Sequence, residues 1–189
     1  AAATKSPVTT AKIKAAGISL GYPKAWTAAP LTKQALKEMR KNLHRTSPEA
    51  ADALEGASTE AIAGAAKLFA IDLAASASGE FANNVNVIVV KSADFPGSLD
   101  DFTTGVASYY QGINAVLETT AAVKIGRKVA YRADASYALQ LADGSATSLH
   151  IAQLVLANGK SSDVITVTTT DDAASDRITD DLFASVRYL

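Results

Sequence analysis

The sequence predicts an α+β fold: an antiparallel β-sheet with helices on both faces, arranged as an α/β/α sandwich. Alternating apolar segments in the second half of the chain are separated by short turns containing glycine, a pattern typical of a β-meander. Residues 85–90, VNVIVV, are apolar on both faces, so this strand needs cover on each side. Amphipathic helical patterns before and after that strand supply the cover.

The first half of the chain begins with a strand and continues with two helices. Residues 18–22 alternate apolar side chains and precede Pro23 and Trp26, which predicts a half-buried strand, a turn and an aromatic anchor. Residues 30–45 place apolar side chains four apart, which predicts a helix with a basic outer face. Ser47 then caps a second helix that reaches about residue 66.

Strands dominate the remainder. Residues 67–75 alternate and predict a strand before the central strand. Ser98 and Asp101 form a capping box that opens a helix over residues 99–113. A final helix begins near Asp171, where acids suit the positive end of the helix dipole. The meander strands are expected at residues 121–125, 128–137, 147–156 and 163–169.

Length and composition indicate one domain, over residues 17–189. Residues 1–16 are polar and do not begin with Met, and we interpret them as a tether after a removed export signal. The chain has no cysteine, which excludes disulfides, thiolate nucleophiles and zinc fingers. No apolar run is long enough for a membrane-spanning helix. The expected location is therefore the cell envelope or the exterior.

Charge is unevenly distributed along the chain. Residues 1–45 hold nine basic side chains and one acidic side chain, although the net charge of the whole is −1. This asymmetry indicates an anionic surface or an acidic protein as a partner for the first segment, while the overall charge argues against nucleic acid. A solvated outer helix face explains the same pattern. The candidate partner-binding residues are Lys33, Lys37, Arg40 and Lys41.

Two adjacent aromatic residues are the candidates for lining a groove. Tyr109 and Tyr110 lie in the predicted helix over residues 99–113 and could face a groove between that helix and the sheet. The alternative is that one tyrosine packs in the core while the other lies at the rim with its hydroxyl in water.

No catalytic residue, metal ligand or cofactor site is predicted. The chain has no G-x-S-x-G or S-x-x-K motif and no phosphate-binding glycine loop. His44 and His150 are too few for a zinc site, and His150 is interpreted as an ordinary sheet residue. Asp172, Asp176 and Asp180 recur every four residues, which spreads them too far along a helix for one ion and favours a solvated face.

Four segments resemble the PsbP-like fold and, within it, the actinobacterial LpqN/LpqT-type lipoproteins. They are GISLGYPKAW, NNVNVIVVKSADFPGSLDDF, SLHIAQLVLANGKSSDVITVTTT and the closing ASVRYL. The resemblance covers the chain from about Gly17 onward and implies an exported or lipid-anchored protein that binds or assists partners. It supplies no catalytic residues. The acyl anchor of such a lipoprotein would need a cysteine, which could only stand before Ala1.

Together these observations predict a non-enzymatic binding or accessory protein of the cell envelope with an unidentified protein partner. The alternative is a carrier that holds a small apolar ligand or lipid in a groove between sheet and helices. The two differ in one structural feature. A carrier needs a continuous apolar pocket of about 300 Å³ or more, and a protein-binding module does not.

Overall fold

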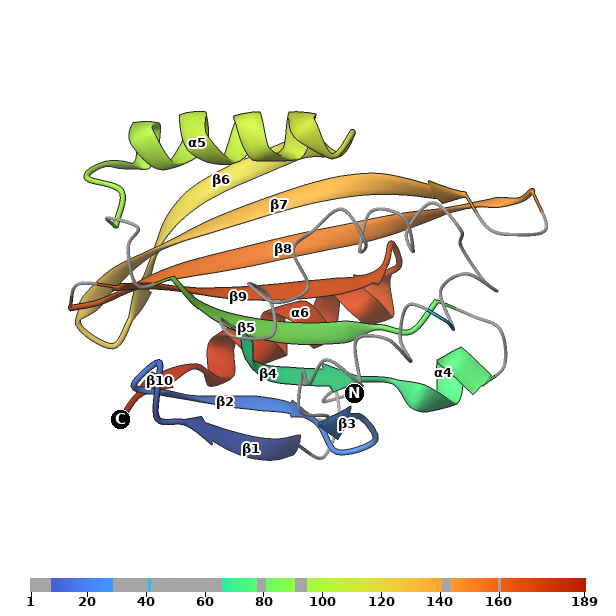
Figure 1. The fold of residues 1–189 in the computed structure, drawn as a ribbon, viewed down its shortest axis with the longest axis horizontal. Helices are drawn as coiled ribbons and strands as arrows, with labels where there is room; N and C mark the ends of the chain where they lie inside the picture. Colours follow the sequence, from blue (N-terminus) through green and yellow to red (C-terminus); the bar gives the residue numbers. More distant parts are fainter. Residues whose placement is uncertain are drawn as a thin grey trace, which may run out of the picture.

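Two antiparallel sheets and three helices make up the part of the chain that the computed structural model describes, namely residues 8–28, 41, 66–77, 81–90, 95–140, 144–159 and 161–189 (Figure 1). The smaller sheet contains β1 (Val8–Ile13), β2 (Ile18–Pro23) and β10 (Arg187–Tyr188). The larger sheet contains β3 (Thr27–Ala28), β4 (Ala66–Ile71), β5 (Asn84–Val90), β6 (Val116–Ile125), β7 (Lys128–Gln140), β8 (Ala146–Asn158) and β9 (Ser161–Thr170). The helices are α4 (Leu73–Ala77), α5 (Leu99–Gly112) and α6 (Ala173–Ser185).

The larger sheet has the strand order β3-β4-β5-β9-β8-β7-β6, and all its pairs are antiparallel. The hairpins β6–β7 and β8–β9 turn at Gly126 and Gly159, whose φ angles are 62° and 60°. Glycine adopts positive φ values without steric strain because it has no Cβ atom. These φ values allow a tight turn whose twist matches that of the two strands it joins. The predicted meander is confirmed, and its strands are longer than expected.

Each of the two longer helices begins at a side-chain cap. Ser98 Oγ accepts the N–H of Asp101 at 3.1 Å and opens α5, as the capping box predicts. Asp172 Oδ1 accepts the N–H groups of Ala174 and Ser175 at 2.9 Å and opens α6.

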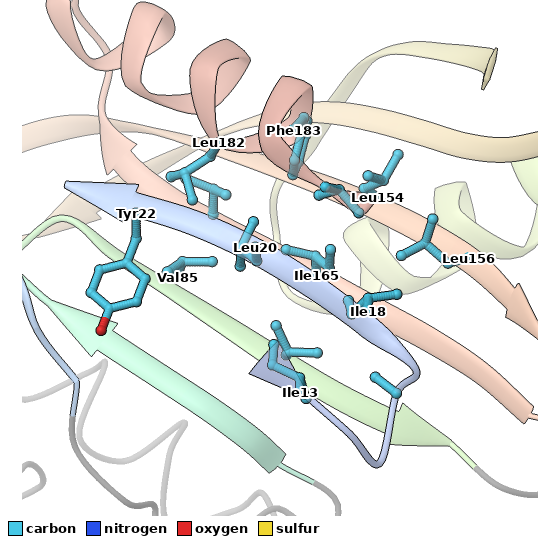
Figure 2. Close-up of a cluster of buried hydrophobic side chains, with 14 of the residues drawn as sticks. Ile13, Ile18, Leu20, Tyr22, Val85, Leu154, Leu156, Ile165, Leu182 and Phe183 are labelled. Atoms are coloured by element: carbon cyan, nitrogen blue, oxygen red, sulfur yellow. The ribbon is translucent and has the colours of Figure 1, made fainter. Parts of the chain in front are cut away.

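Helices α5 and α6 pack on opposite faces of the larger sheet. Phe102, Val106 and Tyr110 of α5 pack on the face that carries Tyr131 and the other odd-numbered side chains of β7. On the other face, α6 and the smaller sheet share the main core (Figure 2). The largest fully buried aliphatic side chains of that core are Ile18, Leu20, Leu154, Leu156, Ile165 and Leu182.

The central strand β5 alternates as predicted. Val87 and Val89 are buried in the main core, whereas Ile88 and Val90 point to the opposite face and are only half-buried. The described residues therefore cover one face of β5 fully and leave its other face partly open.

Three details differ from the sequence analysis. The chain forms two sheets where one was expected, and the strand at residues 18–22 belongs to the smaller one. Residues 8–13, assigned to the polar tether, form β1 and pair with β2. Leu73, expected in a strand, is an exposed residue of α4. The predicted helices over residues 30–45 and 48–66 lie outside the described residues, except for Lys41, which is helical and exposed.

Candidate functional site

An open cleft of about 760 Å³ lies between α5 and the half-covered face of the larger sheet. We call it the α5 cleft. Strands β5, β9 and β8 form its floor, and α5 forms a wall. Among the described residues it is lined by Asn86, Ile88, Val90, Pro96, Asp101, Phe102, Gly105, Val106, Tyr109, Ile151, Gln153, Val155, Ser162, Val164, Thr166 and Thr168.

Strand register arranges the floor in rows that run across the strands. Ile88 pairs with Val164 and Val164 with Val155, which gives an apolar row. The next row toward the carboxyl end of β9 pairs Asn86 with Thr166 and Thr166 with Gln153, and we call it the polar row. Residues paired across antiparallel strands lie side by side on one face, so each row is a continuous strip of the floor.

Aromatic packing fixes the position of α5 over the apolar row. Tyr131 continues that row on β7, where it pairs with Val155. The Phe102 ring stacks on Tyr131 with 5.3 Å between ring centroids, and Phe95 stacks on Tyr131 at 5.1 Å. Offset stacking of this kind favours one arrangement of helix and sheet. The stack therefore holds the wall of the cleft beside the apolar row.

One glycine on α5 leaves room in the cleft. Gly105 lines the cleft, and a Cβ atom added there would meet no other atom within 4 Å. Gly112, on the same helix, also has open space at its Cβ position but does not line the cleft. These two glycines provide a matched pair for tests of the cleft.

The two groove candidates have different positions. Tyr109 lines the cleft and its side chain is 52% exposed, whereas Tyr110 is fully buried beneath α5. Burial raises the pKa of Tyr109, so its phenol is neutral at physiological pH. Of this pair, Tyr109 is the residue that can contact a ligand in the cleft without a change of fold, and its role as a groove residue stays a prediction.

In the part of the chain that the structure describes, the polar row contains one buried acceptor without a hydrogen-bond partner and one long hydrogen bond. Asn86 Oδ1 is buried and has no hydrogen-bond partner among the described residues. Gln153 Nε2 reaches Thr166 Oγ1 only at 3.4 Å, which is long for a hydrogen bond. A buried acceptor without a partner costs about 1–3 kcal/mol, so a ligand group that pairs with it gains affinity.

A second polar cluster lies on the opposite face, between the sheet and α6. Arg132 donates two hydrogen bonds of 2.8 Å to Asp134 and one of 2.8 Å to Asp180. His150 Nε2 lies 3.1 Å from Asp134 Oδ1, and its Nδ1 lies 3.4 Å from Asp176 Oδ1. We call these five residues the His150 cluster. They connect β7, β8 and α6.

Contacts within the His150 cluster shift the pKa values of His150 and Asp134. The hydrogen bond to Asp134 raises the pKa of His150, against the lowering effect of its burial. Burial alone would raise the pKa of Asp134, but hydrogen bonds from His150 and Arg132 hold it below its usual value. Each partner therefore favours the charged form of the other. Because its ion pairs join β7 and β8 to α6, the cluster suits the docking of that helix.

Asp172, Asp176 and Asp180 have two different roles in the structure. Their spacing in the sequence had indicated one solvated helix face. Asp172 caps the helix, while Asp176 and Asp180 belong to the His150 cluster and remain more than half exposed. Among the described residues no three His, Cys, Asp or Glu side chains are arranged to hold a metal ion. No helix of the described part is long and apolar enough to cross a membrane.

The predicted partner-binding residues are not tested by the structure. Lys33, Lys37 and Arg40 lie outside the described residues, and Lys41 is described only as an exposed helical residue. Their contact with an anionic surface stays a prediction. Sequence reasoning did not find the rows of the cleft floor. Asn86, Thr166 and Gln153 are far apart in the sequence and become neighbours only through strand pairing.

Comparison with solved structures identifies the fold. The solution structure of cyanobacterial PsbP (CyanoP) from Synechocystis sp. PCC 6803 superposes with a TM-score of 0.60 at 14% identity, covering 100% of this chain and 96% of that one. The chain has the PsbP-like fold. The Ran-binding protein Mog1p of Saccharomyces cerevisiae matches with a TM-score of 0.51 at 9% identity, with 97% of this chain and 96% of Mog1p covered.

The predicted PsbP-like fold is thus confirmed. LpqN, involved in cell envelope biogenesis of Mycobacterium tuberculosis, has a TM-score of 0.45 at 10% identity and covers 98% of this chain and 86% of its own. The sequence itself matches no family model and no curated protein. The two matches with TM-scores of 0.60 and 0.51 show the shared PsbP-like fold, and at 14% and 9% identity they carry no activity across to this chain.

Proposed function

We propose that this chain is an exported, non-enzymatic binding protein of the cell envelope that holds a small, mainly apolar ligand in the α5 cleft. One observation carries the proposal: a cleft of about 760 Å³ whose described lining is mostly aliphatic and aromatic. Ligand pockets in proteins have volumes of about 300–1,000 Å³ and similar linings. The volume of the cleft supports the carrier alternative over a module that binds only proteins.

The polar features of the cleft also suit binding. Its neutral amide and hydroxyl groups can orient a ligand through hydrogen bonds. The described hydrogen bond of the polar row joins two neutral groups, Gln153 and Thr166, and neither of them is a base or an activated nucleophile. Export is proposed from the resemblance of four sequence segments to the LpqN/LpqT-type lipoproteins.

The Gly105→Trp substitution tests the cleft directly. The indole would occupy the open space at Gly105, while Gly112→Trp places the same ring on α5 outside the cleft. The fluorescence of the neutral apolar dye N-phenylnaphthylamine should rise on binding to the wild type and to Gly112→Trp. We expect Gly105→Trp to lower the affinity for the dye about tenfold or more, because the ring fills the site.

Circular dichroism provides the control for folding in both variants. Equal dye binding by Gly105→Trp and Gly112→Trp, with folding intact, would show that the α5 cleft is not the binding site. Loss of dye binding in both variants would indicate damage to α5 itself. In that case Gly105→Leu, which fills the cleft with a smaller side chain, decides. Dye binding by Gly105→Leu equal to that of the wild type would reject the proposal.

A further inference from the structure

The α5 cleft changes from apolar to polar between two neighbouring rows of its floor. The apolar row of Ile88, Val164 and Val155 presents aliphatic side chains only. The polar row presents an amide, a hydroxyl and a second amide. Neighbouring rows on one face of a sheet are about 7 Å apart along the strand. A ligand that fits both rows must therefore change from apolar to polar over a short distance.

The apolar part of the ligand belongs beside the aromatic stack. Tyr131 extends the apolar row under α5, where the Phe102 ring covers it. Phe102 of α5 and Val155 of the apolar row both line the cleft, so this end has apolar side chains on the wall and on the floor. An alkyl chain placed there loses contact with water on two sides, which is the main source of its binding free energy.

The polar part of the ligand belongs at the polar row. Asn86 Oδ1 has no partner among the described residues, and the contact from Gln153 to Thr166 is long. Asn and Gln side chains each offer a donor and an acceptor, and rotation about their terminal torsions is easy. The polar row can therefore both donate to and accept from a hydroxyl or amide head group.

Charge decides between a neutral and an ionised head group. Asp101 is the one charged side chain among the described lining residues, and it is negative. None of the described lining residues is a lysine, arginine or histidine. Against the described lining, a carboxylate head would leave water without a cation to pair with, which is costly, whereas a hydroxyl or amide head loses little.

From these three features we infer that the ligand of the α5 cleft is an uncharged amphiphile. Its alkyl chain lies over the apolar row, and its hydroxyl or amide head forms hydrogen bonds with the polar row. This inference rests on the proposed function and deepens it, because it names the chemical class that the cleft selects.

Two probes that share one acyl chain test the inference. Lauroylglycerol carries an uncharged head with hydroxyl donors, and laurate carries a carboxylate. We expect calorimetric titration of the wild type, at about pH 8 and below the micelle concentration of each probe, to show lauroylglycerol binding about tenfold or more tighter than laurate.

Two isosteric variants on one strand locate the head and the chain. Thr166→Val removes only the hydroxyl of the polar row and should weaken lauroylglycerol about fivefold while leaving laurate unchanged or tighter. Val164→Thr adds a hydroxyl to the apolar row and should weaken both probes alike. One substitution removes a hydroxyl and the other adds one, at positions two residues apart on the same face of β9. Each variant is therefore the control for the other.

The outcomes separate this inference from the proposed function. Equal or tighter binding of laurate, or an equal effect of Thr166→Val on both probes, would overturn the uncharged-amphiphile inference. Dye binding that is lost only in Gly105→Trp would still support the cleft as a binding site in that case. If neither probe binds to the wild type, the inference is also overturned. The proposed function is tested separately, by the dye experiment.

Discussion

His150 shows how single residues gain roles that their immediate sequence does not indicate. It pairs with Ser136 across β8 and β7, and its Nε2 lies near Asp134 of β7 while its Nδ1 lies near Asp176 of α6. Thr169 is its pairing partner on β9. The imidazole is therefore between two carboxylates, and its charged form is favoured. Sequence reasoning treated it as an ordinary sheet histidine because both carboxylates are distant along the chain.

We expect His150 to make folding stability depend on pH. Its folded-state pKa is raised, above an unfolded value of about 6.5. The stabilisation is therefore fully present below about pH 6.5 and is lost as the pH rises through the folded-state pKa. Urea unfolding of the wild type and of His150→Gln at about pH 5.5 and about pH 8.5 measures the difference. The advantage of the wild type should be larger at the lower pH.

Asp176→Asn is the matched variant for that experiment. It removes the exposed partner of His150 and leaves the contact with Asp134, so the pH dependence should shrink without disappearing. A wild-type advantage that does not change between the two pH values would show that the His150 cluster does not bias the protonation of its imidazole.

At the scale of elements, α6 begins at a cap, Asp172, that accepts hydrogen bonds from both backbone and side-chain donors. Asp172 accepts two backbone N–H groups and the hydroxyls of Thr170 and Ser175, and these interactions lower its pKa to about 2. Ser98 at the start of α5 accepts one N–H. The hydroxyl that Asp172 accepts from Ser175 belongs to a buried residue of the first turn of α6, so the cap also fixes a side chain of the interior.

We expect Asp172→Ala to cost about 1–2 kcal/mol of unfolding free energy and Ser98→Ala about 0.5–1 kcal/mol. Denaturant unfolding at neutral pH measures both. The contribution of the Asp172 charge is present above its unfolded pKa of about 3.9 and falls as the pH drops through about 2. An Asp172→Ala variant as stable as Ser98→Ala would show that the extra bonds at this cap do not contribute.

The whole molecule is closed by a contact between its two ends. Gly21 N–H of β2 donates to Ser185 Oγ at the end of α6 at 2.7 Å, and Ser185 donates to Leu182 O at 2.6 Å. Nearby, β10 pairs with β2, and the N–H of Leu189 donates to Gly17 O. The smaller sheet is therefore assembled from both termini of the described fold.

Gly21→Ala should destabilise the protein by about 1–3 kcal/mol, because the added Cβ would lie 3.2 Å from Ser185 Cβ and Oγ. In a double-mutant cycle by denaturant unfolding, combining it with Ser185→Gly should cost less than the two single changes added together. Gly105→Ala is the control, since its Cβ meets open space, and it should stabilise α5 by about 0.5–1 kcal/mol. Strict additivity of Gly21→Ala and Ser185→Gly would rule out the clash.

The local elements of this protein follow from its sequence, because they depend on neighbouring residues. Turn glycines, the capping box at Ser98 and the alternation of residues 85–90 all correspond to the observed strands, turns and caps. Leu73 shows the limit of that reasoning: its alternation with Phe69 and Ile71 suited a longer strand, but the strand ends at Ile71 and Asp72 caps a short helix instead.

Contacts between distant segments were decided by the tertiary structure alone. Alternation told which side chains of β5 share a face, but not that β9 and then β8 lie next to it, so the polar row of Asn86, Thr166 and Gln153 could not be foreseen. The same holds for the division into two sheets, since β2 pairs with a strand at the opposite end of the chain. The sequence determined the kind of fold because periodicity and turn chemistry are local. The site required the structure, because strand order and helix docking bring together residues that no local pattern connects.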